Sequence, residues 1–158
     1  HASFIKMANK ISKVESLGDF LRKGKFEKLF NLVGVINQSD PKQLYLKDAE
    51  KIYSQKFSEK NNIEDLYNIL ICQILQRKID SAEKTINLIL NKDYSNGNAQ
   101  LLKSIINIYL LDKKDARSSI NNARIFQKSP ESNEIINFVE GLTYLLELKF
   151  NHAFRFLT

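Results

Sequence analysis

The sequence is poor in the residues that mark disulfide-bonded, loop-rich and membrane-spanning proteins. Its 158 residues include five glycines, two prolines and one cysteine, and so few glycines and prolines argue against a loop-rich or all-β chain. The single cysteine, Cys72, excludes an internal disulfide and is typical of a reducing compartment. No apolar run approaches the roughly 20 residues that a membrane-spanning helix needs. We therefore expect a cytoplasmic protein without a membrane span.

Apolar residues recur every three or four positions along the chain, which is the period of an amphipathic helix. No segment alternates with period two for long enough to predict a strand. The sequence therefore predicts an all-α fold of about eight or nine helices. The predicted ranges are 4–23, 26–37, 41–56, 63–76, 80–91, 99–111, 112–128 and 131–149, with a ninth helix opening near Asn151.

Two predicted helix starts combine a capping residue with a proline. Asp40 and Ser129 can each cap the helix that follows, and the proline after each takes the first helical position, where its missing N–H costs nothing. Between the predicted helices 41–56 and 63–76, residues Phe57–Asn62 are predicted to form a loop. The last helical pattern is expected to break at Phe150–Asn151.

Small residues near the start of alternate helices recur with a period close to 34. Ala49, Ala82, Ala116 and Ala153 are separated by 33, 34 and 37 residues. Each is followed four residues later by an apolar side chain: Tyr53, Ile86, Ile120 and Leu157. Helix pairs joined by short turns and repeated at this interval predict stacked helical hairpins.

The end of the chain carries the residues of a known repeat. Gly141 is followed three residues later by Tyr144, and a second helical pattern then opens with Ala153 and Leu157. Small residues at these positions would let two antiparallel helices approach closely. This pattern resembles the tetratricopeptide repeat.

The resemblance implies a single domain over residues 1–158, built as a right-handed superhelix of stacked antiparallel helix hairpins (a TPR-like α-solenoid). Hairpins would occupy 26–158, and 1–25 would form an extra N-terminal helix. Residues 151–158 supply only about two turns, and isolated helices under roughly 12 residues are marginal in water. We therefore expect either a piece of a longer repeat protein or self-association through the C-terminal edge.

No group of residues in the sequence indicates a catalytic site. Cys72 lies in a strongly apolar stretch and is interpreted as a packing residue, and His152 lies at the predicted start of a helix, where it would cap or face solvent. A thiol nucleophile needs a histidine base, and a metal site needs a second ligand three or four residues away. We predict no enzyme activity, no cofactor and no metal site.

The first helix of each clear pair is apolar around most of its circumference, with one narrow polar stripe. In this repeat family the first helices line the concave binding face. We therefore predict a non-enzymatic interaction module, or scaffold, that binds a segment of a partner protein in a concave groove, with the asparagines serving recognition. A plain solvent-facing strip is the alternative. The predicted groove residues are Asp65, Asn68, Gln76, Lys103, Asn107, Asn137 and Tyr144.

Positive charge is concentrated in the first third of the chain. The net charge is +6, and residues 1–60 hold 12 Lys and Arg against 7 Asp and Glu. Contact with RNA or another anionic partner is therefore the alternative function. A solvated helix face explains the same charges without a partner. The candidate basic residues are Lys10, Lys13, Arg22, Lys23, Lys25 and Lys28.

Overall fold

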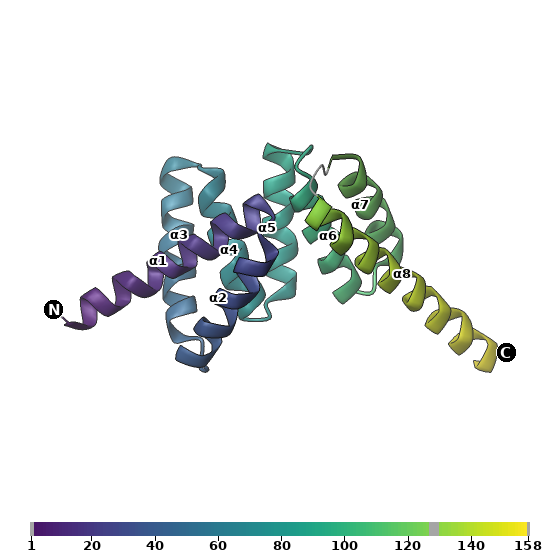
Figure 1. Cartoon of the computed structure of the whole chain (residues 1–158), viewed down its shortest axis with the longest axis horizontal. Coiled ribbons are helices and arrows are strands. Elements are labelled where there is room, and N and C mark those ends of the chain that lie inside the picture. Colours follow the sequence, from purple (N-terminus) through teal and green to yellow (C-terminus); the bar gives the residue numbers. More distant parts are fainter. Residues whose placement is uncertain (1, 127–129, 158) are drawn as a thin grey trace. The chain divides into compact units, whose positions relative to one another are not determined.

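The computed structural model describes the backbone of residues 2–126 and 130–157, and the side chains of residues 8–9, 11–112, 114–126 and 130–145. Over these backbone ranges the chain forms eight α-helices and no strand, which confirms the predicted all-α class (Figure 1). The helices are α1 (Ala2–Lys23), α2 (Phe26–Ser39), α3 (Leu44–Lys60), α4 (Ile63–Leu75), α5 (Ile79–Lys92), α6 (Gly97–Tyr109), α7 (Lys113–Phe126) and α8 (Pro130–Leu157). Of these helices, none is long and apolar enough to cross a bilayer.

The helices fall into two compact units. Unit 1 (His1–Lys92) contains α1 to α5, and unit 2 (Asp93–Thr158) contains α6 to α8. In unit 1, α4 packs against α1, α3 and α5, while α1 also contacts α2 and α3 (Figure 1). In unit 2, α6 packs against α7, and α8 contacts both of them.

Helix α4 is the centre of unit 1 because neighbours cover it on three sides. Every residue from Leu66 to Gln73 is buried, including the polar Asn68. A helix covered in this way has no face that must stay polar. The nearly continuous apolar sequence of α4 reflects this central position.

The loops after α4 and α6 have the same backbone geometry, 34 residues apart. After α4, the Arg77 N–H donates to Ile74 O (2.9 Å) and the Lys78 N–H donates to Gln73 O (2.9 Å). The matching bonds after α6 join Leu111 N–H to Ile108 O (3.0 Å) and Asp112 N–H to Asn107 O (2.8 Å). This pair of bonds is the Schellman motif, which ends a helix with one residue in the left-handed region. Arg77 and Leu111 occupy that position, with φ of 62° and 60°.

The same turn joins α1 to α2, a pairing that the sequence pattern did not indicate. Gly24, with φ of 72°, donates its N–H to Leu21 O (3.3 Å), and the Lys25 N–H donates to Phe20 O (2.9 Å). Glycine reaches this conformation without a steric penalty. Hairpins with one kind of turn therefore form at α1–α2, α4–α5 and α6–α7.

The repeated alanines are buried where the sequence predicts small packing residues. Ala49, Ala82 and Ala116 are all 0% exposed. The residues four positions later, Tyr53, Ile86 and Ile120, are at most 1% exposed. Ala153 and Leu157, the last pair of the pattern, lie outside the described side chains.

Two predicted boundaries in unit 1 are wrong. Helix α3 begins at Leu44 rather than at Pro41, although Asp40 does cap it: its carboxylate accepts the N–H of Leu44 (3.0 Å) and of Tyr45 (3.1 Å). The predicted loop Phe57–Asn62 belongs largely to the same helix, which continues to Lys60. Its sequence contains neither glycine nor proline, so nothing in it forces an earlier end.

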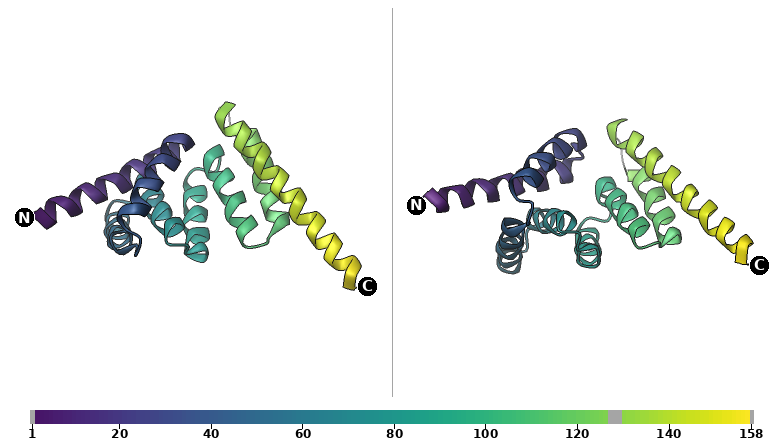
Figure 2. Two further views of the ribbon diagram at one scale, coloured as in Figure 1. Left: turned by 60° about the horizontal axis from the view of Figure 1, so that its bottom comes forward. Right: turned by 90° about the horizontal axis from the view of Figure 1, so that it is seen from below.

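The predicted break at Phe150–Asn151 is also wrong. Helix α8 runs for 28 residues without interruption, and its C-terminal part extends past α6 and α7 (Figure 2). Neither Phe150 nor Asn151 is a helix breaker, and a short polar residue alone does not end a helix. Gly141 also fails to act as a close-approach residue, since a Cβ there would meet nothing within 4 Å in the described part of the chain.

Candidate functional site

The predicted groove residues are divided between the two units. Asp65 and Asn68 lie on α4 and Gln76 directly follows it, so these three belong to unit 1. In unit 2, Lys103 and Asn107 lie on α6, and Asn137 and Tyr144 lie on α8. The two groups have different surroundings.

Gln76 belongs to a hydrogen-bond network inside unit 1. Its Nε2 donates to Glu50 Oε1 on α3 (2.9 Å), and Gln73 Nε2 donates to Glu50 Oε2 (3.2 Å). Lys78 Nζ also donates to Glu50 Oε1 (2.9 Å), and Thr85 on α5 donates its hydroxyl to Gln73 Oε1 (2.6 Å). Gln76 therefore fastens α3 to α4, and the network reaches α5.

The charge of Glu50 depends on these donors. Burial alone would raise the pKa of this carboxyl, but hydrogen bonds from Lys78, Gln76 and Gln73 outweigh burial and lower the pKa. Hydrogen bonds to the ionised form favour ionisation. Glu50 is thus held as a carboxylate at the junction of three helices.

The two asparagines expected to serve recognition are buried. Asn68 is 7% exposed and Asn107 is 3% exposed. Asn68 is covered by α1, where Gly18 faces it: a Cβ on Gly18 would overlap the Asn68 Oδ1 atom. Asn107 lies on α6, which packs against both α7 and α8. The apolar periodicity of one helix does not indicate how many neighbours will cover its polar stripe.

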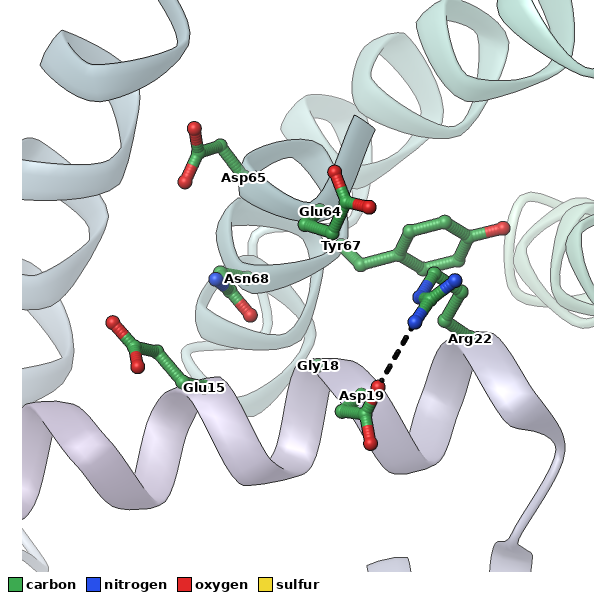
Figure 3. Close-up of a pocket in the computed structure, with 8 residues that line it drawn as sticks. All are labelled: Glu15, Gly18, Asp19, Arg22, Glu64, Asp65, Tyr67 and Asn68. Atoms are coloured by element: carbon green, nitrogen blue, oxygen red, sulfur yellow. Dashed lines mark hydrogen bonds and ion pairs between the residues drawn. The ribbon is translucent and has the colours of Figure 1, made fainter. Parts of the chain in front are cut away.

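A pocket of about 280 Å³ lies between α1 and α4 in unit 1 (Figure 3). Four carboxyl groups and one guanidinium line it, so its charged groups sum to −3. The lining residues are Glu15, Gly18, Asp19, Arg22, Glu64, Asp65, Tyr67 and Asn68.

The carboxyl groups of this pocket differ in their partners. Asp19 is paired with Lys23 (3.0 Å) and Arg22 (3.1 Å), and these hydrogen bonds, chiefly that of Lys23, lower its pKa. The pKa of Asp65 is raised, first by burial and then by repulsion from Glu64 and Glu15, against the opposing effect of nearby lysines. Burial is thus the main reason that the pKa of Asp65 is raised.

In unit 2 the polar stripe of α8 remains on the surface. Asn137 is exposed, Tyr144 is 52% exposed and Glu140 lies between them. Two arginines of α7 reach this stripe. Arg124 donates to Asn137 Oδ1 (3.1 Å) and pairs with Glu140 (3.3 Å), and the Arg117 guanidinium lies 4.7 Å from the centre of the Tyr144 ring. We call Arg117, Arg124, Asn137, Glu140 and Tyr144 the α7–α8 surface.

The sequence interpretation missed both arginines of this surface. Arg117 and Arg124 are seven residues apart, which places them on one face of α7. That spacing could have indicated a shared surface, but not which helix they would face. Lys103, the predicted groove residue on α6, is half-buried.

The candidate nucleophile has the surroundings of a core residue. Cys72 is 0% exposed, and burial, followed by repulsion from Glu50, raises the pKa of its thiol to about 12. A buried thiol with a raised pKa is a poor nucleophile. The side chain of His152 lies outside the described part of the chain. Within that part, no group of three or more His, Cys, Asp and Glu is placed to hold a metal ion.

The basic residues in the first third of the chain differ in their exposure and in their ion pairs. Arg22 and Lys23 are paired with Asp19, and Lys13 is partly buried. Lys25 and Lys28 are exposed, and the side chain of Lys10 is not among those described. Because the acidic pocket lies on the same helix as Arg22 and Lys23, the positive charge of α1 is partly cancelled where the pocket opens.

Comparison with models of protein families, with curated proteins and with solved structures finds no match to this chain.

Proposed function

We propose that this chain is a non-enzymatic interaction module of the tetratricopeptide-repeat type, a right-handed superhelix of helical hairpins that binds a segment of a partner protein. The recurring turn supports the repeat architecture, because the same two backbone bonds end α4 and α6 at an interval of 34 residues. The buried alanines Ala82 and Ala116 support it too, since they stand at equivalent places in the two hairpins. Hairpins that repeat at such an interval are the building unit of helical solenoids.

The exposed α7–α8 surface is the observation that carries the binding function. Tyr144 is half-exposed beside Arg117, and Phe138 and Leu145 on the same helix are 68% and 57% exposed. Aromatic residues and arginine are enriched where proteins bind one another. Amide, carboxylate and guanidinium groups beside apolar side chains suit a partner segment that presents both backbone polar groups and apolar side chains.

Photo-crosslinking tests this proposal at the level of single residues. We would place a benzophenone amino acid at Tyr144 and, as a matched control, at Tyr109 on α6, which is 72% exposed and lies outside the α7–α8 surface. We expect a discrete protein adduct from position 144 in native lysate and none from position 109. Equal adducts at both positions, or none at position 144, would contradict the proposal.

High salt and nuclease treatment distinguish binding of a partner protein from binding of nucleic acid. Counterion release makes binding to nucleic acid weaken steeply with salt, whereas recognition by aromatic and apolar contacts changes little. We expect the adduct at position 144 to form equally well when the lysate is treated with nuclease before irradiation, and when irradiation takes place at 0.5 M salt, a condition chosen as roughly three times physiological ionic strength. Loss of the adduct under either treatment would favour the nucleic-acid alternative.

A further inference from the structure

The pocket between α1 and α4 exists because the two helices cross at a glycine. Gly18 has no Cβ, and the Asn68 side chain takes the space that a Cβ would fill. On either side of this crossing the two helices bear charged side chains, which line the pocket (Figure 3). The pocket is thus built from two packed helices rather than from a loop.

Asn68 is the polar group of this pocket that lacks a partner. Its side chain is 7% exposed, yet neither of its amide atoms has a hydrogen-bond partner among the residues that the structure describes. In Figure 3 its amide points into the space between α4 and α1. The amide oxygen and nitrogen of Asn68 can therefore bond a group that enters the pocket.

The available groups of the pocket accept hydrogen bonds. Glu15 and Glu64 are exposed and form no ion pair with any described residue, and Asp65 adds a half-buried carboxyl to the same lining. The Asn68 Oδ1 adds a further acceptor. A ligand that matches such a lining must be positively charged and rich in N–H donors.

We propose that the α1–α4 pocket binds the guanidinium group of an arginine side chain from a partner protein. A guanidinium presents five N–H donors in one plane and can therefore bond several carboxylates at once, whereas an ammonium acts as a compact point charge. A divalent metal fits less well, because the described acids of the pocket are not grouped closely enough to hold one. The identity of the occupant as a protein side chain rests on the proposed interaction function, but the pocket belongs to unit 1 alone.

Titration with short peptides tests the pocket independently of the α7–α8 surface. The probe is the end-blocked peptide Gly-Gly-Arg-Gly-Gly, and the observable is the shift of the Gly18 and Asn68 backbone amide signals in ¹⁵N-labelled protein. We expect saturable shifts at both residues. The citrulline peptide has nearly the same shape but no charge, and we expect it to bind about tenfold more weakly.

Substitutions of the glutamates that line the α1–α4 pocket then test whether the peptide binds there. Glu15→Gln and Glu64→Gln should each weaken the arginine peptide about threefold, and both together about tenfold. Glu27→Gln is the matched control, because Glu27 is, like Glu64, an exposed acid in the first turn of a helix but lies on α2. We expect it to leave binding unchanged, and circular dichroism checks that every variant is folded.

Four results would overturn the proposal. Equal binding of the citrulline peptide would exclude recognition of the charge. Equal binding of Gly-Gly-Lys-Gly-Gly, which carries an ammonium group instead, would exclude selection of a guanidinium. Shifts unaffected by Glu15→Gln and Glu64→Gln would place the binding elsewhere. Equal binding of the amino acid arginine, whose carboxylate the pocket should repel, would show that the occupant is a small molecule. If crosslinking at Tyr144 fails while the titration succeeds, the proposed function fails and the pocket remains.

Discussion

Units 1 and 2 each contain a mostly apolar helix with a narrow polar stripe, but the two stripes have different surroundings. On α4, Asn68 lies beneath α1, and Gln76 bonds to α3. On α8, Asn137 and Tyr144 stay exposed: Asn137 accepts a hydrogen bond from Arg124 and the Tyr144 ring lies beside Arg117, both arginines of α7. The difference follows from the number of neighbours: three helices pack on α4, whereas α8 contacts α6 and α7.

The same sequence pattern can therefore serve packing in one place and recognition in another. A polar stripe covered by a further helix must find hydrogen-bond partners inside the protein, as Gln73 and Gln76 do with Glu50. A stripe without a cover remains available to a partner.

The largest expected effect is overpacking at the repeated alanines. Ala82→Leu in unit 1 and Ala116→Leu in unit 2 should each lower the free energy of unfolding by about 1–3 kcal/mol, because both sites are fully buried at a helix–helix contact. Urea denaturation would measure both changes. A stability unchanged by Ala116→Leu would remove this alanine from the helix contact and weaken the equivalence of the two hairpins.

Glycines should respond in opposite directions in the two units. Gly18→Ala places a Cβ on the Asn68 amide, and an overpacking cost of about 1–3 kcal/mol exceeds the helix-propensity gain of about 0.5–1 kcal/mol. Gly141→Ala meets no described atom within 4 Å, so only the propensity gain of about 0.5–1 kcal/mol applies. We expect a lower melting temperature for the first variant and a higher one for the second. A change of melting temperature in the same direction for both variants would contradict the close crossing of α1 and α4.

Glycine at the two repeated turns should stabilise both units alike. Arg77→Gly and Leu111→Gly replace side chains held at positive φ, and each should raise the free energy of unfolding by about 0.5–1 kcal/mol. Gly24→Ala, at the third such turn, is the reverse substitution and should lower stability by a similar amount. Chemical denaturation would detect all three, and a loss of stability in Arg77→Gly would show that this side chain makes contacts that outweigh its strain.

Lowering the pH should reduce the stability of unit 1, because Glu50 becomes protonated. Its pKa is lower in the folded chain than in the unfolded chain, so it contributes stability above its ordinary pKa of 4.5, and this contribution is lost as the pH falls through the folded-state value. Between pH 6 and pH 3 the wild type should therefore lose more stability than Glu50→Gln. Parallel pH profiles for the two proteins would show that the Gln73–Gln76–Lys78 network does not depend on the charge.

The all-α class and the buried alanines could be predicted because they depend on local periodicity. The sequence spacing of Ala82 and Ala116 corresponds to one turn geometry repeated in the structure. The covered polar stripe of α4 could not be predicted in the same way. Gly18 and Asn68 are 50 residues apart, and nothing local indicates that they meet.

Helix ends were the least predictable feature. The short polar residues Asn151 and Asn61 look alike in the sequence, but α8 continues through Asn151, whereas α3 ends before Asn61, which adopts φ of 55°. Asparagine tolerates both the helical and the left-handed conformation. The identity of the residue therefore does not decide which conformation is used.

The rate of thiol labelling tests the contrast between the two stripes most directly. Cysteine would be introduced singly at Asn68, Gln76, Asn137 and Tyr144, and Cys72 can stay in place because its buried thiol, with a pKa of about 12, should not react in the folded protein. We expect cysteines at positions 137 and 144 to react with an aromatic disulfide reagent about as fast as in the urea-unfolded chain. The cysteine at position 68 should react at least about tenfold more slowly than in the unfolded chain, because Asn68 is buried and reaction there requires local opening, and the one at half-buried position 76 should react at an intermediate rate. Equal rates at all four positions would contradict the account.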